Sequence, residues 1–233
     1  MTIENILTQP PSLPLIAPSV LSADFANMGA DCAATIQAGA DLLHLDVMDG
    51  HFVPNLTLGP DFCRSLRNAM PDVFLDVHLM VTDPAMFIEP FAHAGANHYT
   101  FHIEVVEDPG ALVESIHQAG MTAGLAINPP TDVSTILPHL ELFDLILIMS
   151  VNPGYSGQSF IPEVLEKARE IKPRLKSNQR LEIDGGVNKD SVSACRDAGC
   201  DVLAAASAIF KADEYSSAIT MLRGESVVES RSS

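Results

Sequence analysis

Four short stretches of the chain have nearly the same form: QAGAD at residues 37–41, HAGAN at 93–97, QAGMT at 118–122 and DAGCD at 197–201. In each, a helical pattern ends at a glycine and an apolar strand pattern follows. Glycine just past a helix end supplies the left-handed residue that closes a C-terminal cap. The four glycines are 56, 25 and 79 residues apart. These spacings are close to two, one and three units of about 26 residues, the size of one strand, one helix and two short loops.

Apolar runs occur where such units require strands, at residues 15–20, 42–48, 73–81, 99–103, 123–127, 145–151, 181–183 and 202–206. Helical stretches between them include 26–38, 84–94, 109–119, 162–176 and 188–198, with N-cap oxygens offered by Asp24, Thr82 or Asp83, Asp108 and Asn188. Near-continuous apolar strands that alternate with helices indicate a parallel sheet covered on its faces. Eight units predict an α/β fold, the (β/α)8 TIM barrel. A doubly wound open sheet is the alternative, but no GxGxxG follows the first strand.

We expect a flexible N-terminal extension over residues 1–14, a single catalytic barrel domain over 15–225 and a polar tail over 226–233. The first 14 residues have no basic or apolar region typical of a secretory signal. The four cysteines form no CxxC pair and are too few for a disulfide scaffold, which predicts reduced thiols and a cytoplasmic location.

The charge of the chain excludes several classes of partner and mechanism. Thirteen Lys and Arg stand against 30 Asp and Glu in 233 residues, a formal net charge of −17. Such an acidic chain repels nucleic acid and anionic membrane surfaces. Arg64 and Arg67 are the only basic residues before Lys167. A lysine Schiff base or a basic phosphate clamp in the first two-thirds of the chain is therefore excluded.

Three of the expected strands end on polar side chains. Alternation places His44 and Asp46 on one face of the strand at 42–48 and His78 on one face of the strand at 73–81, while Asp184 ends the strand at 181–183. Two histidines and two carboxylates at the same end of a barrel suit Zn²⁺ or a similar divalent transition ion. The competing interpretation is a set of hydrogen-bonded polar residues that line the barrel, as Asp76 and Glu182 would. Four converging residues favour the metal.

Three glycine- and serine-containing loops follow the last three expected strands: NPGYSGQ at 152–158, GGV at 185–187 and ASA at 206–208. Loops after strands seven and eight form the usual phosphate site of this barrel. Backbone N–H groups bind a phosphate there without lysine. The predicted phosphate-binding residues are Gly154, Tyr155, Ser156, Gly157, Gly185, Gly186, Ala206 and Ser207.

Six longer motifs cover most of residues 16–223: IAPSVLSADF (16–25), HLDVMDGHFVPNLTLGP (44–60), DVHLMV (76–81), MSVNPGYSGQSFIP (149–162), LEIDGGV (181–187) and ASAIF (206–210). With these motifs the chain resembles the ribulose-phosphate 3-epimerase family. The resemblance implies a TIM barrel that interconverts the phosphorylated ketopentoses D-ribulose 5-phosphate and D-xylulose 5-phosphate, with one divalent metal per subunit (Zn, Fe, Mn or Co). It also implies a homo-oligomer, a dimer or a hexamer.

The resemblance further implies roles for individual residues. Its metal ligands fall on His44, Asp46, His78 and Asp184, its acid/base pair on Asp46 and Asp184, and its substrate contacts on Ser19, His78, Met48, Met80 and Met149. The chain departs from the family's commoner pattern at two positions. Ser156-Gly157 stands where the loop usually has Gly-Gly, and Ala206-Ser207 where it usually has Gly-Ser. Both changes add side-chain bulk near the phosphate.

The residues support the same chemistry independently of the resemblance. Epimerisation beside a carbonyl removes a proton from one face and returns one to the other, which needs two acid/base groups. Asp46 and Asp184 come from strands far apart around the barrel. A lysine-dependent aldolase or decarboxylase is disfavoured because His78 occupies the position of the lysine. An epimerase of a hexulose 6-phosphate such as D-allulose 6-phosphate, and a catalytically idle phosphate-binding barrel, remain as alternatives.

Overall fold

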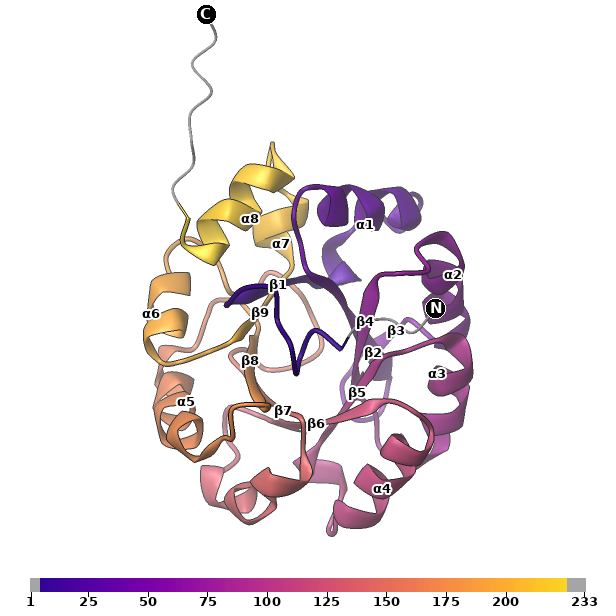
Figure 1. The fold of residues 1–233 in the computed structure, drawn as a ribbon, viewed down its shortest axis with the longest axis vertical. Coiled ribbons are helices and arrows are strands. Elements are labelled where there is room, and N and C mark those ends of the chain that lie inside the picture. Colours follow the sequence, from indigo (N-terminus) through magenta and orange to yellow (C-terminus); the bar gives the residue numbers. More distant parts are fainter. Residues whose placement is uncertain (1–4, 226–233) are drawn as a thin grey trace, which may run out of the picture.

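The structure is a computed structural model that describes residues 5–225, and these form a ring of parallel strands surrounded by helices (Figure 1). The strands of the ring are β1 (Leu15–Pro18), β2 (Leu42–Asp49), β4 (Phe74–Met80), β5 (His98–His102), β6 (Thr122–Ile127), β7 (Leu145–Met149), β8 (Arg180–Asp184) and β9 (Val202–Ala205). They are hydrogen-bonded in the order β1-β9-β8-β7-β6-β5-β4-β2. A parallel bridge between Ser19 and His44 joins the end of β1 to β2 and closes the ring. The predicted (β/α)8 barrel is confirmed.

A short strand, β3 (Leu56–Thr57), pairs antiparallel with the end of β2. The helices around the ring are α1 (Met28–Gln37), α2 (Pro60–Ala69), α3 (Ile88–Ala94), α4 (Gly110–Gln118), α5 (Leu165–Ile171), α6 (Val192–Asp197), α7 (Ser207–Phe210) and α8 (Tyr215–Arg223). Between β6 and β7, the two 3-10 helices Val133–Thr135 and Leu137–Leu142 take the place of an α-helix.

The glycines of the four repeated stretches have the predicted left-handed conformation, with φ of 102° at Gly39, 91° at Gly95, 87° at Gly120 and 92° at Gly199. Several helices are shorter than expected. The stretch 162–176 is interrupted because Pro173 has no N–H to continue the α-helix, and α5 passes into a 3-10 turn over Lys172–Arg174.

The expected N-cap positions were wrong for three helices. Asp24, Asp108 and Asn188 each accept a hydrogen bond from the backbone N–H two residues ahead, at 3.0, 3.0 and 2.8 Å. These contacts are Asx turns that precede the helices. The N-cap residues of α1, α4 and α6 are instead Asn27, Pro109 and Ser191.

Residues alternate along each strand between the outer core and the barrel interior. In β2, Leu43 and Leu45 pack in the core beneath the helices, whereas His44 and Asp46 face the interior, where they contact each other and residues of other strands. The N-terminal end of the interior holds a separate apolar cluster that includes Leu15, Leu42, Phe74, Leu145 and Val202.

Residues 5–14 differ from the expected flexible extension. Leu7 is only 1% exposed and belongs to the apolar cluster at the N-terminal end of the barrel. The indigo segment in Figure 1 crosses the opening of the ring at this point. Leucine in this position covers apolar side chains at the first residues of several strands, which gives the segment a fixed place. Residues 1–4 and the predicted polar tail at 226–233 lie outside the described residues.

Among the helices of residues 5–225, none combines the length and the apolar character that crossing a membrane requires.

Candidate functional site

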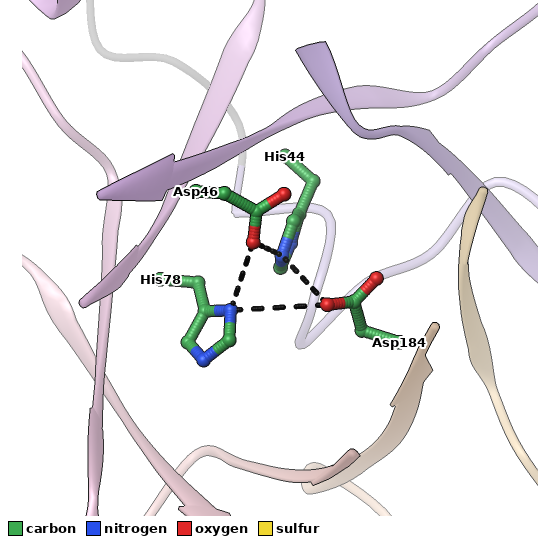
Figure 2. Close-up of side chains that lie close together, drawn as sticks. All are labelled: His44, Asp46, His78 and Asp184. Carbon is green, nitrogen blue, oxygen red and sulfur yellow. Dashed lines mark hydrogen bonds and ion pairs between the residues drawn. The ribbon is translucent and has the colours of Figure 1, made fainter. Parts of the chain in front are cut away.

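Four side chains from three strands converge inside the barrel (Figure 2): His44 and Asp46 of β2, His78 of β4 and Asp184 of β8. The parallel register of β2 and β4 sets Asp46 opposite His78. Asp46 Oδ1 lies 3.4 Å from His44 Nε2 and 3.1 Å from His78 Nδ1. Asp184 Oδ2 lies 4.0 Å from His44 Nε2 and 3.9 Å from His78 Nδ1. One nitrogen or oxygen of each residue therefore faces a common point.

This group suits a divalent transition ion. Its four ligand atoms all lie within 4.8 Å of one another, and two imidazole nitrogens with two carboxylate oxygens are a donor set that such ions accept. His44 Nε2 is buried and has no hydrogen-bond partner among the described residues. A buried nitrogen without a partner is costly, and a cation at the common point would satisfy it. The residues present thus fit a metal ion.

The sides of these ligands that face away from the common point are held by further polar groups. His44 Nδ1 lies 2.6 Å from Asp76 Oδ2 and 3.3 Å from Glu182 Oε1. The Ser19 hydroxyl donates to Asp46 Oδ2 at 2.5 Å. Asp76 and Glu182 are therefore polar residues that line the barrel interior and contact His44, the role that the sequence analysis considered for them. They lie behind the candidate metal ligands and do not replace them.

The two aspartates of the site have opposite pKa shifts. Burial raises the pKa of Asp46, but His44 and His78 outweigh it and hold that pKa well below its usual range. Burial raises the pKa of Asp184 well above its usual range, and the nearby Asp46 carboxylate raises it further. Burial likewise raises the pKa of Glu182 to about 7, with a further contribution from Asp76. The environment thus favours a charged Asp46 and an uncharged Asp184 before any cation is bound.

A cavity of about 180 Å³ opens beside the cluster at the C-terminal ends of the strands. It brings together fourteen of the predicted site residues: Ser19, Asp46, Met48, Met80, Met149, Gly154, Tyr155, Ser156, Gly157, Asp184, Gly185, Gly186, Ala206 and Ser207. The remaining two, His44 and His78, are fully buried and do not line the cavity. No lysine or arginine of residues 5–225 lines this cavity.

The cavity wall also contains residues that were not among the predicted site residues: Leu21, Val151, Pro153, Gln158, Val187, Asn188 and Ala204. Gln158 and Asn188 flank the predicted phosphate residues in sequence, and this adjacency was the available signal. Gly186 shows why these loops meet. Its φ is 64°, and a Cβ there would lie 2.8 Å from the backbone nitrogen of Phe160. Only glycine lets the loop after β8 approach the loop after β7 this closely.

Two contacts join the loop after β2 to the loop after β7 at the cavity edge. The Asn55 side-chain amide donates to the Gly154 carbonyl at 2.8 Å, and the Tyr155 hydroxyl donates to the Pro54 carbonyl at 2.7 Å. Tyr155 nevertheless remains 56% exposed. These contacts hold the predicted phosphate loop at 154–157 against the loop that follows β2, the strand of His44 and Asp46.

Sequence reasoning missed His102 and Glu104, which adjoin the site behind His78. The available signal was the alternation of β5, which turns His98, Thr100 and His102 toward one face. The apolar run in this part of the sequence indicated a strand and no more.

A closed parallel barrel with ionisable groups and glycine loops gathered at the C-terminal ends of its strands defines a TIM-barrel enzyme. Solved structures agree on the fold. A ligand complex of KGPDC from Streptococcus mutans has a TM-score of 0.72 at 13% identity, covering 91% of this chain and 97% of that one. A 3-hexulose-6-phosphate synthase from Salmonella typhimurium has a TM-score of 0.67 at 14% identity, covering 90% and 97%.

Sequence comparison identifies the family. Residues 15–210 match the model of the Ribulose-phosphate 3 epimerase family. The ribulose-phosphate 3-epimerase of Escherichia coli (strain K12) is 46% identical over 214 residues, which cover 91% of this chain and 95% of the relative. That of Mycobacterium tuberculosis (strain ATCC 25618 / H37Rv) is 46% identical over 213 residues, covering 90% and 92%. The chain belongs to the ribulose-phosphate 3-epimerase family and is an isomerase of the epimerase class.

Proposed function

We propose that this chain interconverts D-ribulose 5-phosphate and D-xylulose 5-phosphate at the third carbon, with Asp46 and Asp184 as the two acid/base groups. The observation that carries the proposal is that both carboxylates line one cavity although β2 and β8 are not adjacent in the ring. A base on one side of the substrate and an acid on the other are what inversion of a carbon requires. The two relatives named above carry the name of this reaction.

In the proposed reaction one aspartate is ionised and takes the proton from the third carbon, which leaves an enediolate. The other aspartate is protonated and returns a proton to the opposite face. In the reverse direction the two exchange roles. Ser19 keeps the Asp46 carboxylate in place through its 2.5 Å hydrogen bond to Oδ2, so that Oδ1 stays turned toward the histidines.

We propose that His44, Asp46, His78 and Asp184 hold one divalent ion per subunit, Zn²⁺, Fe²⁺, Mn²⁺ or Co²⁺. When bound, such an ion is a Lewis acid that stabilises negative charge developing on the substrate oxygens. Met48, Met80 and Met149 line the cavity but are at most 2% exposed. Their proposed role is to form an apolar wall that keeps water from the planar intermediate.

The phosphate of the substrate is proposed to bind the backbone N–H groups of the loops at 154–157, 185–186 and 206–207. These loops line the same cavity as the two aspartates. The side chains of Ser156 and Ala206 point to a site slightly tighter than one with glycine at both positions. Backbone amides and a bound cation supply positive potential, which fits an anionic substrate in a cavity whose described lining residues include no lysine or arginine.

The test is incubation of the cation-loaded protein with D-ribulose 5-phosphate in D₂O. We expect deuterium at the third carbon and D-xylulose 5-phosphate as product. Asp46→Asn and Asp184→Asn should each lower kcat by about 10²–10⁴-fold with the fold intact. Asp190→Asn, which changes an exposed carboxylate in the loop after β8, should not. Absence of exchange in the wild-type protein would reject the proposal, and wild-type activity in either catalytic variant would reject the two-aspartate scheme. The same assay with D-allulose 6-phosphate tests the hexulose alternative.

Oligomeric state and location stay predictions. The expected homo-oligomer, a dimer or a hexamer, is tested by light scattering of the purified chain. The expected cytoplasmic location is tested by fractionation.

A further inference from the structure

A second histidine lies directly behind the candidate ligand His78. His102 Nε2 is 2.8 Å from His78 Nε2, on the side of the His78 ring away from the proposed cation. The ring centroids are 5.0 Å apart and the ring planes differ by 27°. Centroids this far apart with nitrogens this close place the two rings edge to edge, so that an N–H of one points at the lone pair of the other. His102 is fully buried, and the ring of Phe52 packs against it with the ring centroids 4.7 Å apart.

The other nitrogen of His102 contacts a carboxylate. His102 Nδ1 lies 3.0 Å from Glu104 Oε2, and the side chain of Glu104 is 20% exposed. Glu104 Oε1 accepts a hydrogen bond from the backbone N–H of Asn128 at 2.8 Å. The loop that contains Asn128 is held in turn by Lys167 Nζ, which donates to the carbonyls of Asn128 and Pro129 at 2.8 and 2.9 Å and to that of Thr131.

Glu104 is ionised at neutral pH. Burial opposes its charge, but hydrogen bonding to His102 and the Asn128 N–H lowers its pKa to about 2. An ionised carboxylate accepts hydrogen bonds and donates none. His102 therefore carries its proton on Nδ1, and its Nε2 becomes an acceptor. The proton of a neutral His78 then lies on Nε2, which leaves the lone pair of His78 Nδ1 free.

His78 can bind a cation only if the lone pair on its Nδ1 is free, but a neighbouring carboxylate of the site favours a proton on this nitrogen. Asp46 Oδ1 lies 3.1 Å from His78 Nδ1, so Asp46 favours a proton on that nitrogen. Asp46 and Glu104, which contact the two ends of the His78–His102 pair, thus favour opposite tautomers of these histidines. Without the charge of Glu104, nothing among the described contacts would oppose Asp46.

We propose that His102 and Glu104 are positioning residues that set the tautomer and orientation of His78 and thereby raise the affinity of the site for its divalent ion. This inference rests on the proposed function, because it requires the cation site. Groups of this kind, which hydrogen-bond the far nitrogen of a ligating histidine, change metal affinity by about 10–100-fold when removed.

The test variant is Glu104→Gln. The backbone N–H of Asn128 needs an acceptor, so the amide oxygen of the glutamine takes the place of Glu104 Oε1. The amide N–H₂ then faces His102 Nδ1 and makes this nitrogen an acceptor, which moves the His102 proton to Nε2 and the His78 proton to Nδ1. We expect Co²⁺, titrated into metal-free protein and followed by its visible absorption, to bind about 10–100-fold more weakly than to the wild type. Glu107→Gln is the matched control, because it removes the same charge from an exposed position in the same loop. It should bind Co²⁺ as the wild type does.

Imidazole ¹⁵N spectra give a second readout that a merely structural role would not move. In the Zn²⁺-loaded wild type, with histidine selectively labelled, we expect the proton on Nδ1 of His102 and on Nε2 of His78. A His102 proton on Nε2 would overturn the inference, whether or not Glu104→Gln folds. Equal Co²⁺ affinity of folded Glu104→Gln and wild type would also overturn it and leave the cation site standing. Failure of the wild type to bind either ion would reject the cation site itself, and the positioning role with it.

Discussion

Removal of the proposed divalent ion is expected to destabilise the protein by an amount that follows from the concentration of the ion relative to its Kd. Four carboxylates, Asp46, Asp76, Glu182 and Asp184, lie in the barrel interior at 3, 1, 0 and 8% exposure. A ligand at 100 times its Kd stabilises the folded state by about 2.7 kcal/mol. For a chain of this length, 1 kcal/mol moves Tm by about 2–4 °C. We therefore expect Tm to rise by about 5–10 °C when metal-free protein receives Zn²⁺ or Co²⁺ at that concentration.

The variant Asp184→Asn makes this prediction sharper, because its two effects have opposite signs. In the metal-free folded protein Asp184 is kept uncharged, because its pKa is raised well above its usual range, whereas in the unfolded chain it is ionised at neutral pH. Asparagine removes the cost of protonating it on folding, which should raise the Tm of the metal-free protein at neutral pH. The substitution also removes a ligand charge, which should reduce the increase in Tm that the ion produces. Asp190→Asn should change neither value, because this carboxylate is exposed.

Differential scanning calorimetry at fixed pH and protein concentration measures both effects, with Kd taken from the Co²⁺ titration. A wild-type Tm that does not respond to the ion at 100 times Kd would refute the expected link between the cation and stability. An Asp184→Asn variant that gains as many degrees from the ion as the wild type does would refute it as well.

Three further predictions concern stability and substrate binding. Leu7→Ala should lower the free energy of unfolding by about 2–5 kcal/mol. Leu56→Ala is the control, because Leu56 is 78% exposed, and it should change the free energy by about 0.5 kcal/mol or less. Equal effects in urea unfolding would show that Leu7 does not pack against the N-terminal end of the barrel. Glu104 has a folded pKa lowered to about 2 against about 4.3 when unfolded, so its contribution is complete above the unfolded value and is lost as pH falls toward 2. Stability should therefore fall less steeply between about pH 5 and 3 in Glu104→Gln than in the wild type, and parallel curves would contradict this. Gly186→Ala places a Cβ 2.8 Å from the Phe160 nitrogen, so we expect a KM roughly tenfold higher or more with circular dichroism unchanged; an unaltered KM would separate Gly186 from phosphate binding.

Local patterns in the sequence were enough to predict most of the barrel and the four side chains that converge in its interior. The four AG turns predicted the repeat because a left-handed residue at a helix end is a property of glycine itself. Alternation placed His44 with Asp46 because successive side chains on a strand point to opposite faces. The positions of the helix ends were less predictable. Asp24 and Asp108 form Asx turns that compete with capping, and one sequence permits both.

The sequence by itself determined the order of strands and helices, the face of each strand and the residue types at its C-terminal end, since these depend on near neighbours in the chain. Only the tertiary structure decided which faces meet. The closed ring brings Asp184 within 4.0 Å of His44 and lays His102 against His78. It also places Leu7 under strands that follow it by up to about 195 residues. The packed structure also decides the opposite pKa shifts of Asp46, lowered by His44 and His78, and of Asp184, raised by burial, because desolvation and charged neighbours exist only once distant segments have packed together.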